Sequence, residues 1–255
     1  MKKHNLVLLA CSPLVLFFFL NCNPVDTTQK PDPFTQLALE LNRSPRNFSN
    51  NPLTVSPVQL HSQQDWEDLL FFLGSKGRYV NLDISPSTGM TVFNPGRFPN
   101  GKELVVSLVL PDSAVAIPDA HSALNPLATP TFMGFTRLRS ISGKAVETLG
   151  NFSFARSNLI NVDFPALTTI GNSAFRQSPF LTSITIPAGV TSIGNMAFEG
   201  CFNLTTVTFA GNIPQAGFSD NAFIGNLRDR YFDAENGGPG TYTRAANSLE
   251  WTRQD

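Results

Sequence analysis

Hydrophobic positions from residue 80 onward recur in blocks of a little over twenty residues. Each block opens with a short run in which apolar and polar residues alternate: "YVNLDIS", "LVVSLVLP", "LRSISG", "LINVDFP", "LTSITIP" and "LTTVTFA". Such alternation predicts β-strands with one buried face. The expected buried centres of these strands are Leu82, Leu108, Ile141, Val162, Ile184 and Val207.

The spacing of these strands predicts a solenoid. The last four centres lie 21, 22 and 23 residues apart (141 to 162, 162 to 184 and 184 to 207), within the range of roughly 20 to 29 residues of leucine-rich repeats. One repeat cannot cover its own hydrophobic face, so repeats stack around a continuous core. We predict a β-rich solenoid of about six coils over residues 80–226, with an insertion near 117–134 where the spacing widens.

Two columns of residues recur inside the coils. Gly150, Gly171 and Gly194 each precede an asparagine, which predicts a corner with positive φ and an asparagine side chain bonded to neighbouring backbone. Metal binding by the asparagines is the alternative. An aromatic column consists of Phe154, Phe175, Phe198 and Phe223. Its apolar surroundings predict a close-packed interior, whereas a platform for nucleic-acid bases would need exposed rings.

A helix is expected to cap the N-terminal end of the solenoid, within residues 62–79. In "SQQDWEDLLFFLG" Ser62 is the expected N-cap and Gly74 the expected stop. The buried face is predicted to consist of Trp66, Leu69, Leu70 and Leu73. The acidic residues of the first turn are explained by the helix dipole, without a metal or acid–base site.

The C-terminal residues 227–255 are expected to cap the other end. The segments "RYF" and "TYTR" flank a glycine-rich stretch, which predicts a β-hairpin. Its aromatic residues Tyr231, Tyr242 and Trp251 are expected to pack over the last coil.

The first residues predict export. Lys2 and Lys3 precede an uncharged apolar run ending in "FFFLNC", which is typical of a signal peptide over residues 1–21. This ending resembles the loose lipobox of spirochaete lipoproteins and makes Cys22 the expected lipidated residue. The alternatives are lipidation at Cys11, which ends "LLAC", and a plain cleavable signal. Residues 22–61 are rich in Pro, Asn, Ser and Thr and are expected to form a flexible tether, interrupted at "FTQLALELN" by a short strand or docked segment.

Composition and charge exclude several classes of function. The net charge is -1 and Lys and Arg do not cluster, which argues against a nucleic-acid partner. Beyond the signal peptide only His61 and His121 remain as histidines, and no nucleophile, nucleotide or metal-ligand motif accompanies them. We therefore expect no catalysis, cofactor or metal. Cys201 occupies a small-residue position equivalent to Ser157 and Ser178, which predicts a structural cysteine.

The repeat itself resembles a known family. The segment "LTSITIPAGVTSIGNMAFEGCFNL", residues 181–204, is similar to the BspA-like, Treponema pallidum-type leucine-rich repeat LxxIxIPxxVxxIGxxAFxxCxxL. The units before it are more degenerate. The resemblance covers roughly residues 64–255. It implies a protein of the cell surface, outer membrane or periplasm, and it implies adhesion to host matrix proteins or to other cells. An envelope protein that binds another bacterial component in the periplasm is the alternative.

Period-2 alternation also predicts which residues face outward on the main sheet. They are small hydroxyl, amide and acidic residues: Asn81, Asp83, Ser107, Ser140, Ser142, Asn161, Asp163, Ser183, Thr185, Thr206 and Thr208. Such a face suits hydrogen bonding to a protein or glycan partner, with avidity from many lipid-anchored copies on a membrane. The sequence offers no Trp, Tyr or Arg anchor on this face.

Overall fold

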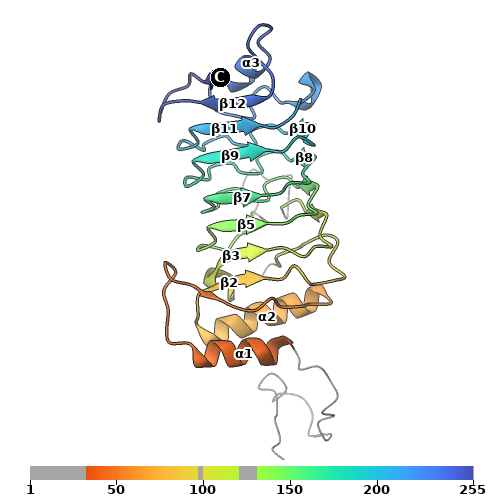
Figure 1. Cartoon of the computed structure of the whole chain (residues 1–255), viewed down its shortest axis with the longest axis vertical. Helices are drawn as coiled ribbons and strands as arrows, with labels where there is room; N and C mark the ends of the chain where they lie inside the picture. The colour runs from red at the N-terminus through yellow and green to blue at the C-terminus, as the bar shows by residue number, and fades with distance from the viewer. Residues whose placement is uncertain (1–32, 97–99, 121–130, 255) are drawn as a thin grey trace, which may run out of the picture.

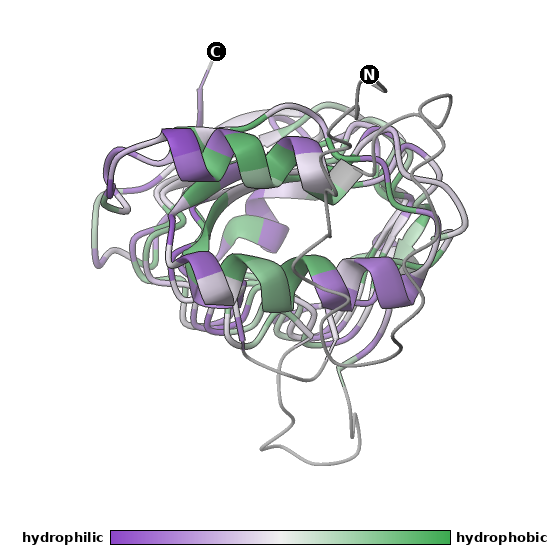
Figure 2. Ribbon diagram, turned by 90° about the horizontal axis from the view of Figure 1, so that it is seen from below, coloured by the Kyte–Doolittle hydropathy of each residue, from purple (hydrophilic) through white to green (hydrophobic). Residues whose placement is uncertain are grey.

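The computed structural model describes residues 33–96, 100–120 and 131–254. In this part of the chain the coils stack into an elongated solenoid (Figure 1). The helices α1 (Pro33–Arg43) and α2 (Gln63–Lys76) lie across its N-terminal end, as Figure 2 also shows, and α3 (Leu227–Tyr231) lies at the other end. The predicted signal peptide, both candidate lipidation residues Cys11 and Cys22, and His121 lie outside the described residues.

Three sheets form the walls of the solenoid. The first is parallel, in the order β1-β2-β3-β5-β7, and comprises β1 (Leu53–Thr54), β2 (Val80–Asp83), β3 (Val105–Val109), β5 (Ser140–Ser142) and β7 (Asn161–Asp163). The second is also parallel, in the order β10-β8-β6-β4, and comprises β4 (Ala116–Ile117), β6 (Thr148–Leu149), β8 (Thr169–Ile170) and β10 (Ser192–Ile193). The third has the order β13-β12-β11-β9 and comprises β9 (Ser183–Ile186), β11 (Thr206–Phe209), β12 (Gly240–Thr243) and β13 (Thr252–Gln254). Two short 3-10 helices, η1 (Lys102–Leu104) and η2 (Gln215–Gly217), precede β3 and follow β11.

The strand centres pair in the predicted register. The pairs are Leu82 with Leu108, Leu108 with Ile141, Ile141 with Val162, and Ile184 with Val207. All of these side chains are buried except Val162, which is half-buried. The repeat pattern therefore placed the inward face of the main strands correctly.

The aromatic column is confirmed as an interior stack. Ring centroids of Phe154 and Phe175 are 5.4 Å apart, those of Phe175 and Phe198 are 5.2 Å apart, and those of Phe198 and Phe223 are 4.5 Å apart. The stack continues toward the N-terminal end through Phe132, 4.5 Å from Phe154. These rings are buried, so they are unavailable to nucleic-acid bases.

The glycines of the Gly–Asn pairs lack positive φ, so that expectation is wrong. The left-handed positions lie two residues further on, at Phe152, Ser173 and Met196. The glycines are needed for another reason. A Cβ on Gly171 would lie 2.7 Å from the carbonyl carbon of Gly150, and one on Gly194 would lie 2.6 Å from the amide nitrogen of Asn172. Neighbouring coils approach so closely here that a larger residue does not fit.

The asparagines of these pairs bond neighbouring backbone, as predicted. The amide N–H of Asn172 donates to Oδ1 of Asn151 at 2.7 Å, and that of Asn195 donates to Oδ1 of Asn172 at 2.7 Å. Asp119 begins the ladder by accepting from the N–H of Asn151 at 2.7 Å. Each side chain thus satisfies a backbone donor of the next coil.

Residues 33–61 do not form the expected flexible tether, whereas the expectation that "FTQLALELN" is a docked segment is confirmed, since it forms most of α1. The helix α1 buries Leu37 and Leu41, and the ring of Phe34 lies 6.4 Å from that of Phe72 on α2. Glu40 on α1 accepts a hydrogen bond from the backbone N–H of Ser56 at 2.9 Å. This segment is an integral part of the N-terminal cap, because it covers apolar surface that α2 and the first coil leave open.

Helix α2 begins as predicted and ends later than predicted. Oγ of Ser62 accepts from the N–H of Asp65 at 3.1 Å, and the predicted face of Trp66, Leu69, Leu70 and Leu73 is buried. Gly74 lies inside the helix, and the helix stops at Gly77, which adopts φ of 61°. A left-handed glycine is the usual C-terminal cap.

The C-terminal cap differs from the predicted hairpin. The "RYF" segment contributes to α3 and does not pair with "TYTR"; β12 instead pairs antiparallel with β11 and with β13. Tyr231, Tyr242 and Trp251 are buried as expected. Aromatic content thus identified the cap, while the glycine-rich stretch gave the wrong strand pairing.

Arg244 closes the last coil beneath this cap. Its guanidinium donates to the carbonyl oxygens of Leu204 at 2.8 Å, Phe202 at 2.8 Å and Ser248 at 2.5 Å, and it lies 5.2 Å from the ring of Trp251. The side chain is buried. One residue therefore satisfies several carbonyls that no further coil is present to pair.

The main wall is interrupted between β7 and β9, which belong to different sheets in the described chain. Ladder hydrogen bonds join β5 to β7 and β9 to β11 in the described chain, but none joins β7 to β9. We call this break the seam.

Coil spacing at the Gly–Asn corner can be tested with Gly194→Ala. We expect the free energy of unfolding to fall by about 2 kcal/mol or more, because the new Cβ forces two backbones apart. Urea denaturation would measure it. Gly189→Ala in the same coil is the control, since its Cβ would meet nothing nearer than 3.2 Å. Equal stability of the two variants would contradict the close-approach explanation.

Candidate functional site

The predicted outward residues of the main strands share one face of the solenoid, which we call the polar face. Strand pairing aligns Asn81, Ser107, Ser140 and Asn161 in one column. A second column aligns Asp83, Ser142 and Asp163, with Val109 between the first two. Beyond the seam Ser183 pairs with Thr206, and Thr185 pairs with Thr208. None of these side chains is buried.

The two ends of the polar face are tied down by hydrogen bonds. Asn81 donates from Nδ2 to Oγ1 of Thr54 at 3.2 Å and accepts from Oγ of Ser107 at 3.0 Å. At the other end the hydroxyls of Thr208 and Thr241 lie 3.0 Å apart. Thr241 belongs to β12, so the C-terminal cap extends the face with residues that the repeat pattern could not assign.

The centre of the polar face carries the available hydrogen-bonding groups. Asn161, Asp163, Ser183 and Thr185 are exposed and flank the seam. Within the described residues their side chains make no hydrogen bond or ion pair. Donors and acceptors that have no partner in the protein remain open to one from outside.

An exposed apolar stripe borders this centre, at the turns that lead into β7, β9 and β11. It consists of Ile160, Phe180 and Phe202, which are 41%, 46% and 63% exposed. The guanidinium of Arg139 lies 4.7 Å from the centre of the Phe180 ring and donates to the carbonyl oxygen of Asn158 at 2.9 Å. Strand alternation did not reveal this apolar stripe, because Phe180 and Phe202 lie before the strand runs and Ile160 stands at the start of "LINVDFP", where the alternation is broken.

Below the seam lies a small apolar void with room of about 10 Å³. It is lined by Val162, Phe164, Ile184 and other interior residues. A single water needs about this much space, so the void does not accommodate an organic ligand.

The cysteine of the last full repeat is structural. Cys201 is buried and its Sγ donates to the carbonyl oxygen of Phe175 at 3.0 Å. Burial raises the pKa of the thiol to about 11. A thiol that stays protonated is a poor nucleophile.

Two further features were sought among the described residues, a metal-binding cluster and a membrane-spanning helix. His, Cys, Asp and Glu side chains there form no group of three placed to hold a metal ion. Helices in the same part of the chain are too short or too polar to cross a bilayer.

Like Cys201, Lys102 is a buried residue with a shifted pKa, and it lies toward the N-terminal end of the core. It is buried, and its Nζ donates to the carbonyl oxygen of Gly96 at 2.5 Å and lies 5.4 Å from the ring of Phe135. Burial lowers its pKa to about 8, although the carboxylate of Glu67 opposes this shift. The ammonium thus holds a loop carbonyl against the aromatic core.

Lys102 should make stability depend on pH. From pH 8 to 10.5 the folded state loses the proton that the unfolded state retains, so unfolding takes up a proton and folded stability rises with pH. We expect the free energy of unfolding of the wild type to rise relative to Lys102→Met by about 3 kcal/mol across this window. Urea denaturation of both proteins at several pH values would measure the difference in their free energies of unfolding. The protonation of all other groups contributes equally to both proteins and cancels. A constant difference would contradict the shifted pKa.

Comparison with protein families agrees with this architecture. A model described as BspA type leucine-rich repeat region matches residues 113–227 in six copies. The match runs from the turn before β4 to the start of α3, and leaves the N-terminal cap and the C-terminal strands outside. No curated protein and no solved structure matches the chain.

Repeats of this kind are typically non-enzymatic scaffolds that bind other proteins. The family match and the parallel strands of the solenoid agree with the resemblance drawn from residues 181–204. Residues 113–227 of this chain are a BspA-type leucine-rich repeat region.

Proposed function

We propose that this chain is an exported, lipid-anchored protein of the cell envelope that binds another protein through the centre of its polar face and the adjacent apolar stripe. The observation that carries this proposal is the combination of unsatisfied polar groups at Asn161, Asp163, Ser183 and Thr185 with exposed aromatic rings beside them. Protein interfaces combine such an apolar, aromatic and arginine-containing centre with a polar rim.

The apolar stripe favours a protein partner over a glycan. Phe180 and Phe202 would bury ring surface against apolar side chains of a partner, and Arg139 would supply a charged hydrogen-bond donor next to Phe180. Truncating an aromatic or arginine residue at the centre of an interface is commonly the most damaging change. The stripe therefore supplies the anchors that the strand residues alone lack.

The envelope location rests on the N-terminal sequence and on the family resemblance. A signal-like run ending at Cys22 favours lipidation there, and many anchored copies would raise avidity for a partner bound weakly by each. Adhesion to host matrix proteins or to other cells is the role that we propose for such copies on the cell surface. A periplasmic partner is the alternative, and the location of the solenoid separates the two.

Binding can be tested with two variants of the site. Phe180→Ser with Phe202→Ser removes the aromatic anchors, and Ser183→Lys with Thr185→Lys fills the polar centre. We expect each double variant to lose at least about tenfold in affinity for an immobilised matrix protein such as fibronectin or laminin that binds the wild type.

The matched control is Ala188→Lys with Thr191→Lys, which adds the same charge at exposed positions of the same coil, between β9 and β10 and outside the strands of the polar face. Unchanged thermal denaturation would establish that all variants are folded. Full binding by both site variants would move the interface elsewhere on the molecule. Loss of binding by the control variant as well would indicate that added positive charge weakens binding wherever it is placed.

The anchor and the location can be tested together in the producing cell. We expect metabolic labelling with an alkynyl fatty acid to mark the wild type and Cys11→Ser but not Cys22→Ser. Protease added to intact labelled cells should then digest the solenoid. Protection until lysis would contradict adhesion and favour the periplasmic alternative, and loss of label in Cys11→Ser would move the lipidation site.

A further inference from the structure

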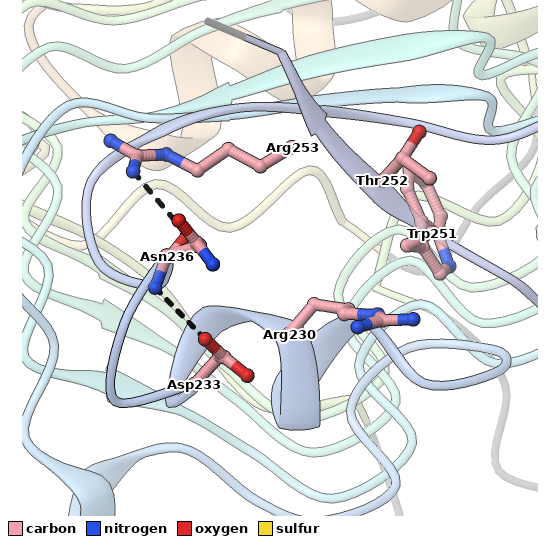
Figure 3. Close-up of a pocket in the computed structure, with 6 residues that line it drawn as sticks. All are labelled: Arg230, Asp233, Asn236, Trp251, Thr252 and Arg253. Carbon is pink, nitrogen blue, oxygen red and sulfur yellow. Dashed lines mark hydrogen bonds between the residues drawn. The ribbon is translucent and has the colours of Figure 1, made fainter.

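The C-terminal cap contains a polar pocket of about 300 Å³, which lies outside the polar face and the apolar stripe (Figure 3). Three segments contribute to it: α3, the loop that follows α3, and β13. Its lining residues are Arg230, Asp233, Asn236, Trp251, Thr252 and Arg253. Its volume is at the lower end of the range for small-molecule sites, which is roughly 300–1,000 Å³.

Arg230 supplies a cation to this pocket. Within the described residues its side chain makes no hydrogen bond or ion pair, whereas its helix neighbour Arg228 is bound to Asp220 at 3.0 Å and to the carbonyl oxygen of Phe218 at 2.7 Å. A guanidinium carries donors in a planar fork that matches a carboxylate. Arg230 can therefore bind an incoming carboxylate without breaking a hydrogen bond, while its charge also helps to keep the carboxylate of Asp233 ionised.

Arg253 approaches the same space from β13 and is held in position. It donates to the carbonyl oxygens of Asn236 at 3.3 Å and Pro239 at 2.8 Å. A guanidinium has five donors, so N–H groups remain after these two contacts. Figure 3 shows its guanidinium next to Asn236, on the far side of the pocket from the guanidinium of Arg230.

The other polar groups suit hydroxyl partners. Oδ1 of Asp233 accepts from the backbone N–H groups of Asn236 at 2.8 Å and Glu235 at 3.1 Å, which keeps the pKa of this carboxyl below its usual value. Its second oxygen and the side-chain amide of Asn236 have no partner within the described residues. An ionised carboxylate accepts hydroxyl donors, and it repels a ligand that is anionic throughout.

Trp251 forms one wall of the pocket and limits how a ligand can contact it. The indole is 1% exposed and its Nε1 donates to the carbonyl oxygen of Ile224 at 2.8 Å, so the ring is part of the core of the cap. It offers an edge and no open stacking face. Recognition in this pocket therefore depends on hydrogen bonds and charge.

We propose that this pocket binds an acidic saccharide, with the sugar carboxylate on Arg230 and the sugar hydroxyls on Asp233, Asn236 and the remaining donors of Arg253. A hexuronic acid carries one carboxylate and several hydroxyls, and this matches two cations, one carboxylate and one amide. A simple dicarboxylate has no hydroxyls for Asp233 and Asn236. The proposal does not rest on protein binding at the polar face.

The proposal can be tested by saturation-transfer difference NMR on the detergent-solubilised full chain, titrated with D-glucuronate. We expect saturable binding with a Kd of about a millimolar, and no saturable signal with neutral D-glucose. Arg230→Gln should weaken binding at least about tenfold, and Arg230→Lys should bind with intermediate affinity, since lysine keeps the charge and loses the fork.

Arg137→Gln is the matched control, because Arg137 is an exposed arginine outside the pocket. It should bind as the wild type does. Absent binding, or equal binding by the wild type and Arg230→Gln, would overturn the site. Glutarate that binds as tightly as glucuronate would overturn the assignment to a saccharide. The site variants of the polar face leave this pocket intact, so they should retain glucuronate binding even if they lose a protein partner.

Discussion

Parallel strands in a sheet lie about 4.8 Å apart, and this fixed spacing governs every coil of the solenoid. Two coils held so close have room at their corner only for a residue without a side chain. Gly171 and Gly194 meet this requirement, since a Cβ on either would collide with the backbone of the preceding coil. The same proximity lets one asparagine reach the next amide, and it brings the phenylalanine rings into contact.

Much of the fold could be predicted because the columns repeat in the sequence. The strand centres, the aromatic stack and the asparagine ladder each depend on one residue type at a regular interval, and all three are confirmed. The turn conformation could not be predicted, because Phe152, Ser173 and Met196 share a left-handed backbone without sharing a side chain. The backbone of the neighbouring coil imposes that conformation through hydrogen bonds such as the one from the N–H of Phe152 to the carbonyl oxygen of Asn172 at 2.9 Å.

The ends of the molecule were harder to predict because each end occurs only once. The helix α1 has few apolar residues on its buried side, and their burial becomes evident only once α2 is beside it. The cap pocket likewise joins Arg230 to Arg253 across a fold that no repeat encodes. Alternation predicted the polar face, but the apolar stripe depends on single substitutions at turns, such as Phe180 and Phe202. Features specific to this chain thus lie where the repeat is interrupted.

The seam between β7 and β9 gives the solenoid an uneven mechanical response. In the second sheet β8 and β10 remain paired through Thr169 with Ser192 and Ile170 with Ile193, and the phenylalanine stack also continues past this level. A bending load therefore opens the wall at the seam first, with the second sheet as its hinge. The exposed residues beside the seam move apart under such a load, while residues within either block keep their spacing. Bending at this level would break none of the strand pairs of the first and third sheets.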